Sequence, residues 1–226
     1  MAAQSAPAAT LMPIFATPFA EIALPVESTL NDALAALLAA RATEERRDLA
    51  RQRDPLCYVS REDLFDWPDE AVAALRSELL AGLCPAVLAT TSHTEAAFDQ
   101  LGLQARARFA IIRADGCLPA ESLALASWCA IYCVAAPPAP SGRVYSGVLR
   151  LYESRLSGMF ADATTWSLRP PFAGGHHLWQ PRPGSMALFP AHLPHEIALN
   201  RSGGDLVLIR VRVRFANPGQ QEAPPW

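Results

Sequence analysis

The chain has 226 residues, 19 of them basic and 22 acidic, and a formal net charge of −3 at pH 7. Hydrophobic residues make up 51% of the chain and charged residues 18%, the composition of an ordinary folded protein that is large enough to bury a substantial core. No basic excess points to nucleic acid. Every basic residue is arginine, which excludes lysine Schiff-base chemistry and a P-loop lysine.

The cysteines and the apolar segments indicate a reduced, cytoplasmic protein. There are five cysteines and no CxxC pair, so the sequence predicts neither a disulfide framework nor a zinc knuckle. Residues Met1–Leu11 lack the cationic and apolar segments of a signal peptide. The apolar run Leu123–Pro137 is too short to cross a bilayer. We therefore expect no membrane partner and no nucleic-acid partner.

The first 105 residues are predicted to be mostly helical. Leucines recur at helical spacing after Thr29, which predicts a first helix. The segment Asp66–Glu70 predicts the start of a second helix, because Pro68 is tolerated in a first turn, and Gly82 suits its end. Thr94–Leu101 has the pattern of a third helix.

From residue 106 the pattern changes to short strands separated by Pro- and Gly-rich turns, which is typical of a sandwich or a barrel. The expected strands are Arg106–Ala114, Ser127–Ala135, Val144–Tyr152, Thr164–Leu168, Ser185–Phe189, Glu196–Asn200 and Asp205–Phe215. Helices followed by strands predict an α+β, mainly β fold in which the helices pack on one sheet. We interpret residues 1–226 as one domain, with a helical N-terminal region (1–105), a strand core (106–216) and a tail (217–226).

Three segments of the strand half resemble a known family. Ile131–Val134 and, after a proline-rich gap, Ser146–Arg155 match a pair of its strands. Gly184–His195 contains the pattern Gly, Leu-Phe-Pro, Leu-Pro-His, and Arg210–Phe215 matches a terminal strand that carries arginine. The chain thus resembles the 2-oxoglutarate/Fe(II)-dependent oxygenases, in a bacterial and phage branch. The resemblance implies a double-stranded β-helix core, a cupin-like jelly roll.

The resemblance also implies a site. In that family two histidines and a carboxylate bind Fe(II) on one face, which leaves the other coordination positions for 2-oxoglutarate and O₂. His195 matches the second histidine. Arg210 matches the arginine that forks onto the distal carboxylate of 2-oxoglutarate. The cofactors implied are Fe(II) and 2-oxoglutarate.

Arg210 belongs to a strictly alternating run, in which Arg210, Arg212 and Arg214 face one side of the strand. If this side is the interior, Arg212 is expected to share an anion-binding pocket with Arg210. Inward guanidiniums are costly unless acids or an anionic ligand pair with them. The alternative is a solvated strand face, or pairing with acids. The acids considered are Glu153, Glu196 and Asp205.

The first iron-binding motif of the family is where the sequence departs from the pattern. The corresponding stretch, Gly116–Ala126, contains no histidine and no aspartate. In the register we favour, Glu121 takes the position of the first histidine and Leu123 that of the carboxylate ligand. A slip of one residue gives Ser122 and Ala124 instead. Glu121 is the one residue of the stretch that can bind iron.

Two further histidines, His176 and His177, follow a pair of glycines. We expect a surface loop there; a replacement metal site is the alternative.

Three hypotheses for the function follow. The first is an oxygenase-like protein that has lost part of its iron site, has no cofactor, and binds a small anion or another ligand without catalysis. The second is an active hydroxylase in which His195 and Glu121 complete an atypical metal site. The third is a structural β-sandwich protein. A homodimer formed through an edge strand is compatible with all three.

Overall fold

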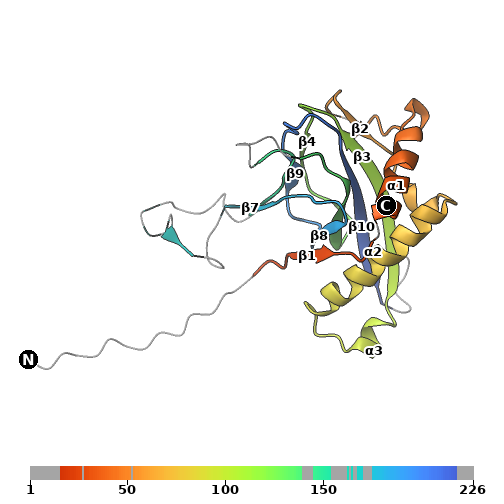
Figure 1. Cartoon of the computed structure of the whole chain (residues 1–226). Helices are drawn as coiled ribbons and strands as arrows, with labels where there is room; N and C mark the ends of the chain where they lie inside the picture. Colours follow the sequence, from red (N-terminus) through yellow and green to blue (C-terminus); the bar gives the residue numbers. More distant parts are fainter. Residues whose placement is uncertain are drawn as a thin grey trace, which may run out of the picture.

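The computed structural model describes residues 16–26, 28–51, 53–138, 145–153, 162, 164, 167–169 and 175–217. Within these ranges the chain forms two antiparallel sheets and a small number of helices (Figure 1). The helical elements are α1 (Ser28–Ala40), η1 (Glu44–Arg46), η2 (Leu64–Asp66), α2 (Glu70–Leu88) and α3 (Glu95–Phe98). The strands are β1 (Ala20–Ala23), β2 (Cys57–Val59), β3 (Gly102–Ile112), β4 (Leu118–Glu121), β5 (Trp128–Ala135), β6 (Leu149–Tyr152), β7 (His176–Trp179), β8 (Ser185–Pro190), β9 (His195–Ile197) and β10 (Leu206–Ala216).

The larger sheet has the strand order β1-β8-β5-β10-β3-β2, and α1 and α2 cover one of its faces (Figure 1). Apolar side chains from both helices and from the sheet form one buried cluster between these two layers. Phe109 of β3 lies within it, fully buried against the rings of Tyr58 and Trp67. The expected α+β, mainly β arrangement with helices on one sheet is confirmed at this level.

The smaller sheet has the order β4-β9-β6-β7. A second apolar cluster combines residues of this sheet with residues from the larger sheet, among them Ile131, Leu149, Phe189 and Ile197. The strand β10 therefore has a buried environment on each side, with helices on one face and the smaller sheet on the other. The two clusters fix the orientation of the side chains on β10.

The second helix is longer than the sequence predicted. It continues through Gly82 to Leu88. Leu24 and Ile22 pack closely on Gly82, where a Cβ would lie 2.7 Å from a methyl group of Leu24, so the glycine allows a close approach and does not end the helix. By length and composition alone this helix could cross a membrane, which is weak evidence because a core helix of a soluble protein passes the same test. Its buried stripe is Val72, Leu75, Leu79, Leu83 and Val87.

Most expected strands are present with shifted ends, and the expected third helix is confirmed as the shorter α3, in which Thr94 caps the N-terminus. The expected strand Val144–Tyr152 is reduced to β6. The strand expected over Thr164–Leu168 is not found at the three of its residues that the structure describes, Thr164, Ser167 and Leu168. Strands β1, β2, β4 and β7 were not predicted. His176 and His177 were expected in a loop; they form the start of β7, exposed at the sheet edge.

Candidate functional site

The arginines of β10 point between the two sheets. Arg210, Arg212 and Arg214 are each at least nine-tenths buried, whereas Val211 and Val213 belong to the cluster under the helices. The alternation predicted for this strand is therefore confirmed, and its charged side is the interior side. Such burial requires that each guanidinium be paired.

A second strand adds another guanidinium to the same place. Arg210 lies directly opposite Arg108 of β3 in the antiparallel register, and the side chains of both are only 8% exposed. Like charges directly opposite each other on neighbouring strands repel. An anionic group between them is needed to stabilise this pair.

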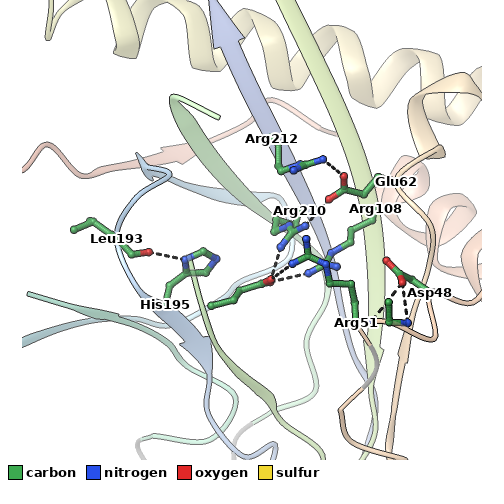
Figure 2. A network of polar contacts seen from close by, with 10 residues as sticks. Asp48, Arg51, Glu62, Arg108, Leu193, His195, Arg210 and Arg212 are labelled. Carbon is green, nitrogen blue, oxygen red and sulfur yellow. Dashed lines mark hydrogen bonds and ion pairs between the residues drawn. The ribbon is translucent and has the colours of Figure 1, made fainter. Parts of the chain in front are cut away.

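Glu121 provides that anionic group. One carboxylate oxygen of Glu121 accepts hydrogen bonds from Arg108, at 2.7 Å, and from Arg210. The other oxygen accepts from Arg51 at 3.0 Å. Figure 2 shows the three arginine side chains converging from β3, β10 and the segment before β2.

Glu62 forms the second acidic centre. One of its oxygens accepts a hydrogen bond from Arg210 at 2.6 Å, and the other accepts from Arg212. Its carboxylate thus lies between the two arginines (Figure 2). Arg214 is held differently, since its Nε donates to the amide oxygen of Gln104 at 2.7 Å. Glu62, Glu121 and Gln104 thus provide hydrogen-bond acceptors that reduce the cost of burying these guanidiniums.

His195 lies beside this network, on the facing sheet. It is paired in register with Glu121 across β9 and β4, and its ring packs edge-on against Phe189 with ring centroids 5.0 Å apart. Its Nδ1 is 2.9 Å from the carbonyl oxygen of Leu193 (Figure 2). Because a carbonyl can only accept, Nδ1 carries the proton and Nε2 carries the lone pair in the neutral ring.

Burial and charge set the protonation states. Burial acts to raise the pKa of Glu121, but the guanidiniums of Arg210 and Arg108 outweigh it and hold that pKa below its usual value of 4.5. Burial lowers the pKa of His195 below 6.5. Burial and the neighbouring Arg210 lower the pKa of Arg108 to about 10. At neutral pH the network therefore holds ionised Glu121, neutral His195 and charged arginines.

A small cavity remains between these side chains. Arg108, Glu121, His195 and Arg210 line it, and we call it the arginine pocket. Its volume of about 30 Å³ is room for about one or two water molecules. Three buried nitrogens of these residues have no hydrogen-bond partner among the described residues: Nη1 of Arg108, Nε of Arg210 and Nε2 of His195. The pocket therefore keeps polar atoms that a bound molecule can satisfy.

The residues predicted as iron ligands lie close together but differ in surroundings. His195 and Glu121 line the same cavity, and Glu121 is engaged by three arginines. Leu123, at the position of the carboxylate ligand, is buried in the apolar cluster between the sheets. In the described part of the chain, no group of three His, Cys, Asp or Glu side chains is arranged to hold a metal ion.

The predicted anion-binding residues Arg210 and Arg212 do share one network, but their partners were not those considered. Glu62 and Glu121 meet them, and Glu196 pairs with Arg150 on the other face of β9. Arg51, Glu62 and Arg108 were missed. Arg108 carried a usable signal, because it falls in a predicted strand where Arg106 and Arg108 alternate with apolar residues.

The sequence matches no protein-family model, and a search of curated proteins finds no match. Solved structures do match. A non-heme alpha-ketoglutarate-dependent carbocyclase, SnoK, from nogalamycin biosynthesis superposes with a TM-score of 0.57 at 14% identity, over 91% of this chain and 84% of its own. HygX from Streptomyces hygroscopicus, solved with nickel and 2-oxoglutarate bound, gives 0.53 at 14% identity, over 92% and 85%.

A prolyl-4-hydroxylase from Pseudomonas putida adds a third likeness, with a TM-score of 0.52 at 17% identity, over 89% of this chain and 93% of its own. These identities are low and the coverage is nearly complete, so the likeness concerns the fold of the whole chain. The resemblance inferred from the strand motifs is confirmed at that level. The chain has the fold of the 2-oxoglutarate/Fe(II)-dependent oxygenases.

Proposed function

We propose that the core is a double-stranded β-helix, or jelly roll. Eight strands support this: β3, β10, β5 and β8 are neighbours in one sheet, and β4, β9, β6 and β7 form the other. Strands that follow each other in the chain mostly alternate between these two sheets, as in a jelly roll built from two Greek keys. In such a core His195 and Arg210 face the space between the sheets.

The protein, as we propose it, is a relative of the oxygenases that binds a small anionic ligand without catalysis. The observation that carries the proposal is the engagement of Glu121 by Arg51, Arg108 and Arg210. An iron ligand must direct its lone pairs to the metal, and three guanidiniums around the carboxylate repel a divalent cation.

The other positions support the same conclusion. Leu123 has no atom that can bind a metal, and its side chain is part of the apolar cluster. His195 would be left as a single nitrogen ligand. The residues present therefore do not fit the site of two histidines and one carboxylate that holds Fe(II) in this fold.

Anion binding is supported by what remains. Arg108 and Arg210 bring buried guanidiniums to a cavity, and each has a nitrogen without a partner among the described residues. Guanidinium forks match carboxylates and phosphates. The cavity is small, so a ligand larger than a few water molecules requires some rearrangement of the side chains that fill it.

The test is a comparison of metal and anion binding by the purified protein. We expect sub-stoichiometric iron, no visible charge-transfer band on anaerobic addition of Fe(II) and 2-oxoglutarate, and no succinate after oxygen is admitted. We also expect 2-oxoglutarate, citrate or phosphate to raise the melting temperature, and Arg210→Met to remove that rise. Stoichiometric iron that is lost in His195→Ala would overturn the proposal. An absence of anion effects would favour a structural β-sandwich protein.

An active hydroxylase is the second candidate. It is favoured by the Nε2 of His195, which is buried, lacks a partner among the described residues and lines the same cavity as Glu121. This candidate predicts that added Fe(II) raises the melting temperature of the wild type and leaves that of His195→Ala unchanged. It further predicts that oxygen consumption depends on 2-oxoglutarate.

A further inference from the structure

The arginines of the pocket already bind carboxylates that belong to the protein. Glu121 accepts from Arg108 at 2.7 Å and from Arg210, which are the contacts that a bound carboxylate would make. Glu62 accepts from another nitrogen of Arg210 at 2.6 Å. Both side chains of the arginine pair are thus occupied from within the chain.

The space left over is too small for an external carboxylate. The cavity of about 30 Å³ takes about one or two water molecules, whereas succinate has many more heavy atoms. The unpartnered Nη1 of Arg108 and Nε of Arg210 show that the internal carboxylates, among the described residues, do not satisfy the pocket completely. A ligand can use these nitrogens only when Glu121 gives up its place.

Glu121 is positioned so that it can do this. It ends β4, which is an edge strand of the smaller sheet and whose pairing with β9 is irregular between Leu118 and Glu121. Non-glycine residues with positive φ, Asp115 and Leu125, lie on either side of β4. The outer oxygen of Glu121 is held by Arg51, whose side chain is 45% exposed. An edge strand with few contacts can shift at lower cost than a central one.

We infer that Glu121, assisted by Glu62, is a built-in competitor that occupies the arginine pocket and yields it to a small-molecule carboxylate. The inference rests on the proposed anion-binding function and adds the ligand class and its regulation. The carboxylate of Glu121 shows which chemical group the arginine pair accepts. Affinity is set by the competition between the internal and the external carboxylate, not by the arginines alone.

The experiment measures the dissociation constants of succinate, acetate and inorganic phosphate by calorimetry at constant ionic strength. Glu121→Gln keeps the shape of the side chain and removes its charge. If the pocket is open in about 1–10% of wild-type molecules, this variant should bind succinate about 10- to 100-fold more tightly. Glu62→Gln should bind it more tightly by a smaller factor. The melting temperature of Glu62→Gln should also rise more steeply with succinate concentration than that of the wild type.

The matched control is Glu44→Gln, which removes an acid that pairs with Arg47 and does not line the pocket. Its affinity for succinate should equal that of the wild type.

Several results would overturn the inference. If the wild type binds succinate and Glu121→Gln binds it no more tightly, Glu121 is not the competitor, although anion binding stands. If Glu121→Gln does not fold, an unchanged affinity in Glu62→Gln leads to the same conclusion. Equal strengthening of phosphate binding would refute the assignment to carboxylates. If neither the wild type nor any variant binds an anion, the proposed function fails together with the inference.

Discussion

The two faces of the larger sheet are both buried, but they are stabilised in different ways. On the face beneath α1 and α2, alternate residues of β3 and β10 are apolar, and their burial needs no partner. On the opposite face Arg108 and Arg210 lie beside each other, and each requires an acid from elsewhere in the chain. The face under the helices is packed with apolar side chains, whereas the opposite face combines an apolar cluster with buried charges that must be balanced.

Substitutions on the two faces should therefore change different properties of the protein, stability on the apolar face and ion binding on the charged face. Removing an apolar side chain leaves a void, and the free energy of unfolding falls without a change in charge. Changing a residue of the charged face alters which ions the interior can hold. The two faces can therefore be tested independently, although they are carried by the same strands.

The largest effect is expected on the apolar face, from Phe109→Ala. Phe109 is fully buried, and its ring packs against those of Tyr58 and Trp67. The substitution should lower the free energy of unfolding by about 3–5 kcal/mol, measured by urea denaturation. Binding of succinate by the folded variant should be unchanged, since the neighbouring Arg108 points to the other face. A loss of anion affinity as large as the loss of stability would show that the faces are not independent.

The sequence was sufficient for the regions of the fold that are governed by local patterns. The alternation of Arg210 to Phe215 predicted which side chains of β10 share a face, and the His195 segment predicted the family fold. Strands β4 and β7 escaped prediction because Leu118–Glu121 contains a proline and His176–Trp179 follows glycines. Neither has the run of β-branched residues that marks a strand.

The acids of the site could not be predicted for a different reason. Glu62 lies 148 residues from Arg210 in the sequence and on a segment outside the strands, and Arg51 lies 70 residues from Glu121. Such contacts depend on the tertiary fold, and the periodic patterns of a sequence do not predict them. Glu121 was identified because the favoured register placed it at the position of the family's first histidine, but its role as the partner of three arginines became visible only in three dimensions.

An intermediate effect is expected from a double-mutant cycle on the charged face. Glu121→Gln leaves Arg108 and Arg210 opposite each other without the acid that they share, and it should destabilise the protein. Arg108→Met in the same chain removes one of the two like charges and should recover some of the loss. We expect a coupling energy of about 0.5–3 kcal/mol from urea denaturation. Additive effects of the two substitutions would mean that Glu121 does not balance this arginine pair.

The smallest effect is expected from the protonation of His195. Burial lowers the pKa of His195 in the folded protein below 6.5, so the unfolded chain takes up a proton first as the pH falls. Stability is therefore fully present above pH 6.5 and is lost as the pH falls from there toward the folded pKa. The loss is at most about 1.4 kcal/mol per pH unit for one proton. Glu121 adds a loss of the same sign at lower pH, below 4.5.

The substitution His195→Gln should flatten the dependence of the free energy of unfolding on pH just below 6.5. It should not change the loss of stability below pH 4.5 that comes from protonation of Glu121. His192→Gln is the matched control, because His192 is exposed and lies on the turn just before the Leu-Pro-His195 segment, and its profile should follow that of the wild type. Urea denaturation at half-unit steps of pH measures the three profiles. Parallel profiles for the wild type and His195→Gln would show that the pKa of His195 is the same in the folded and the unfolded chain, which contradicts the effect of its burial.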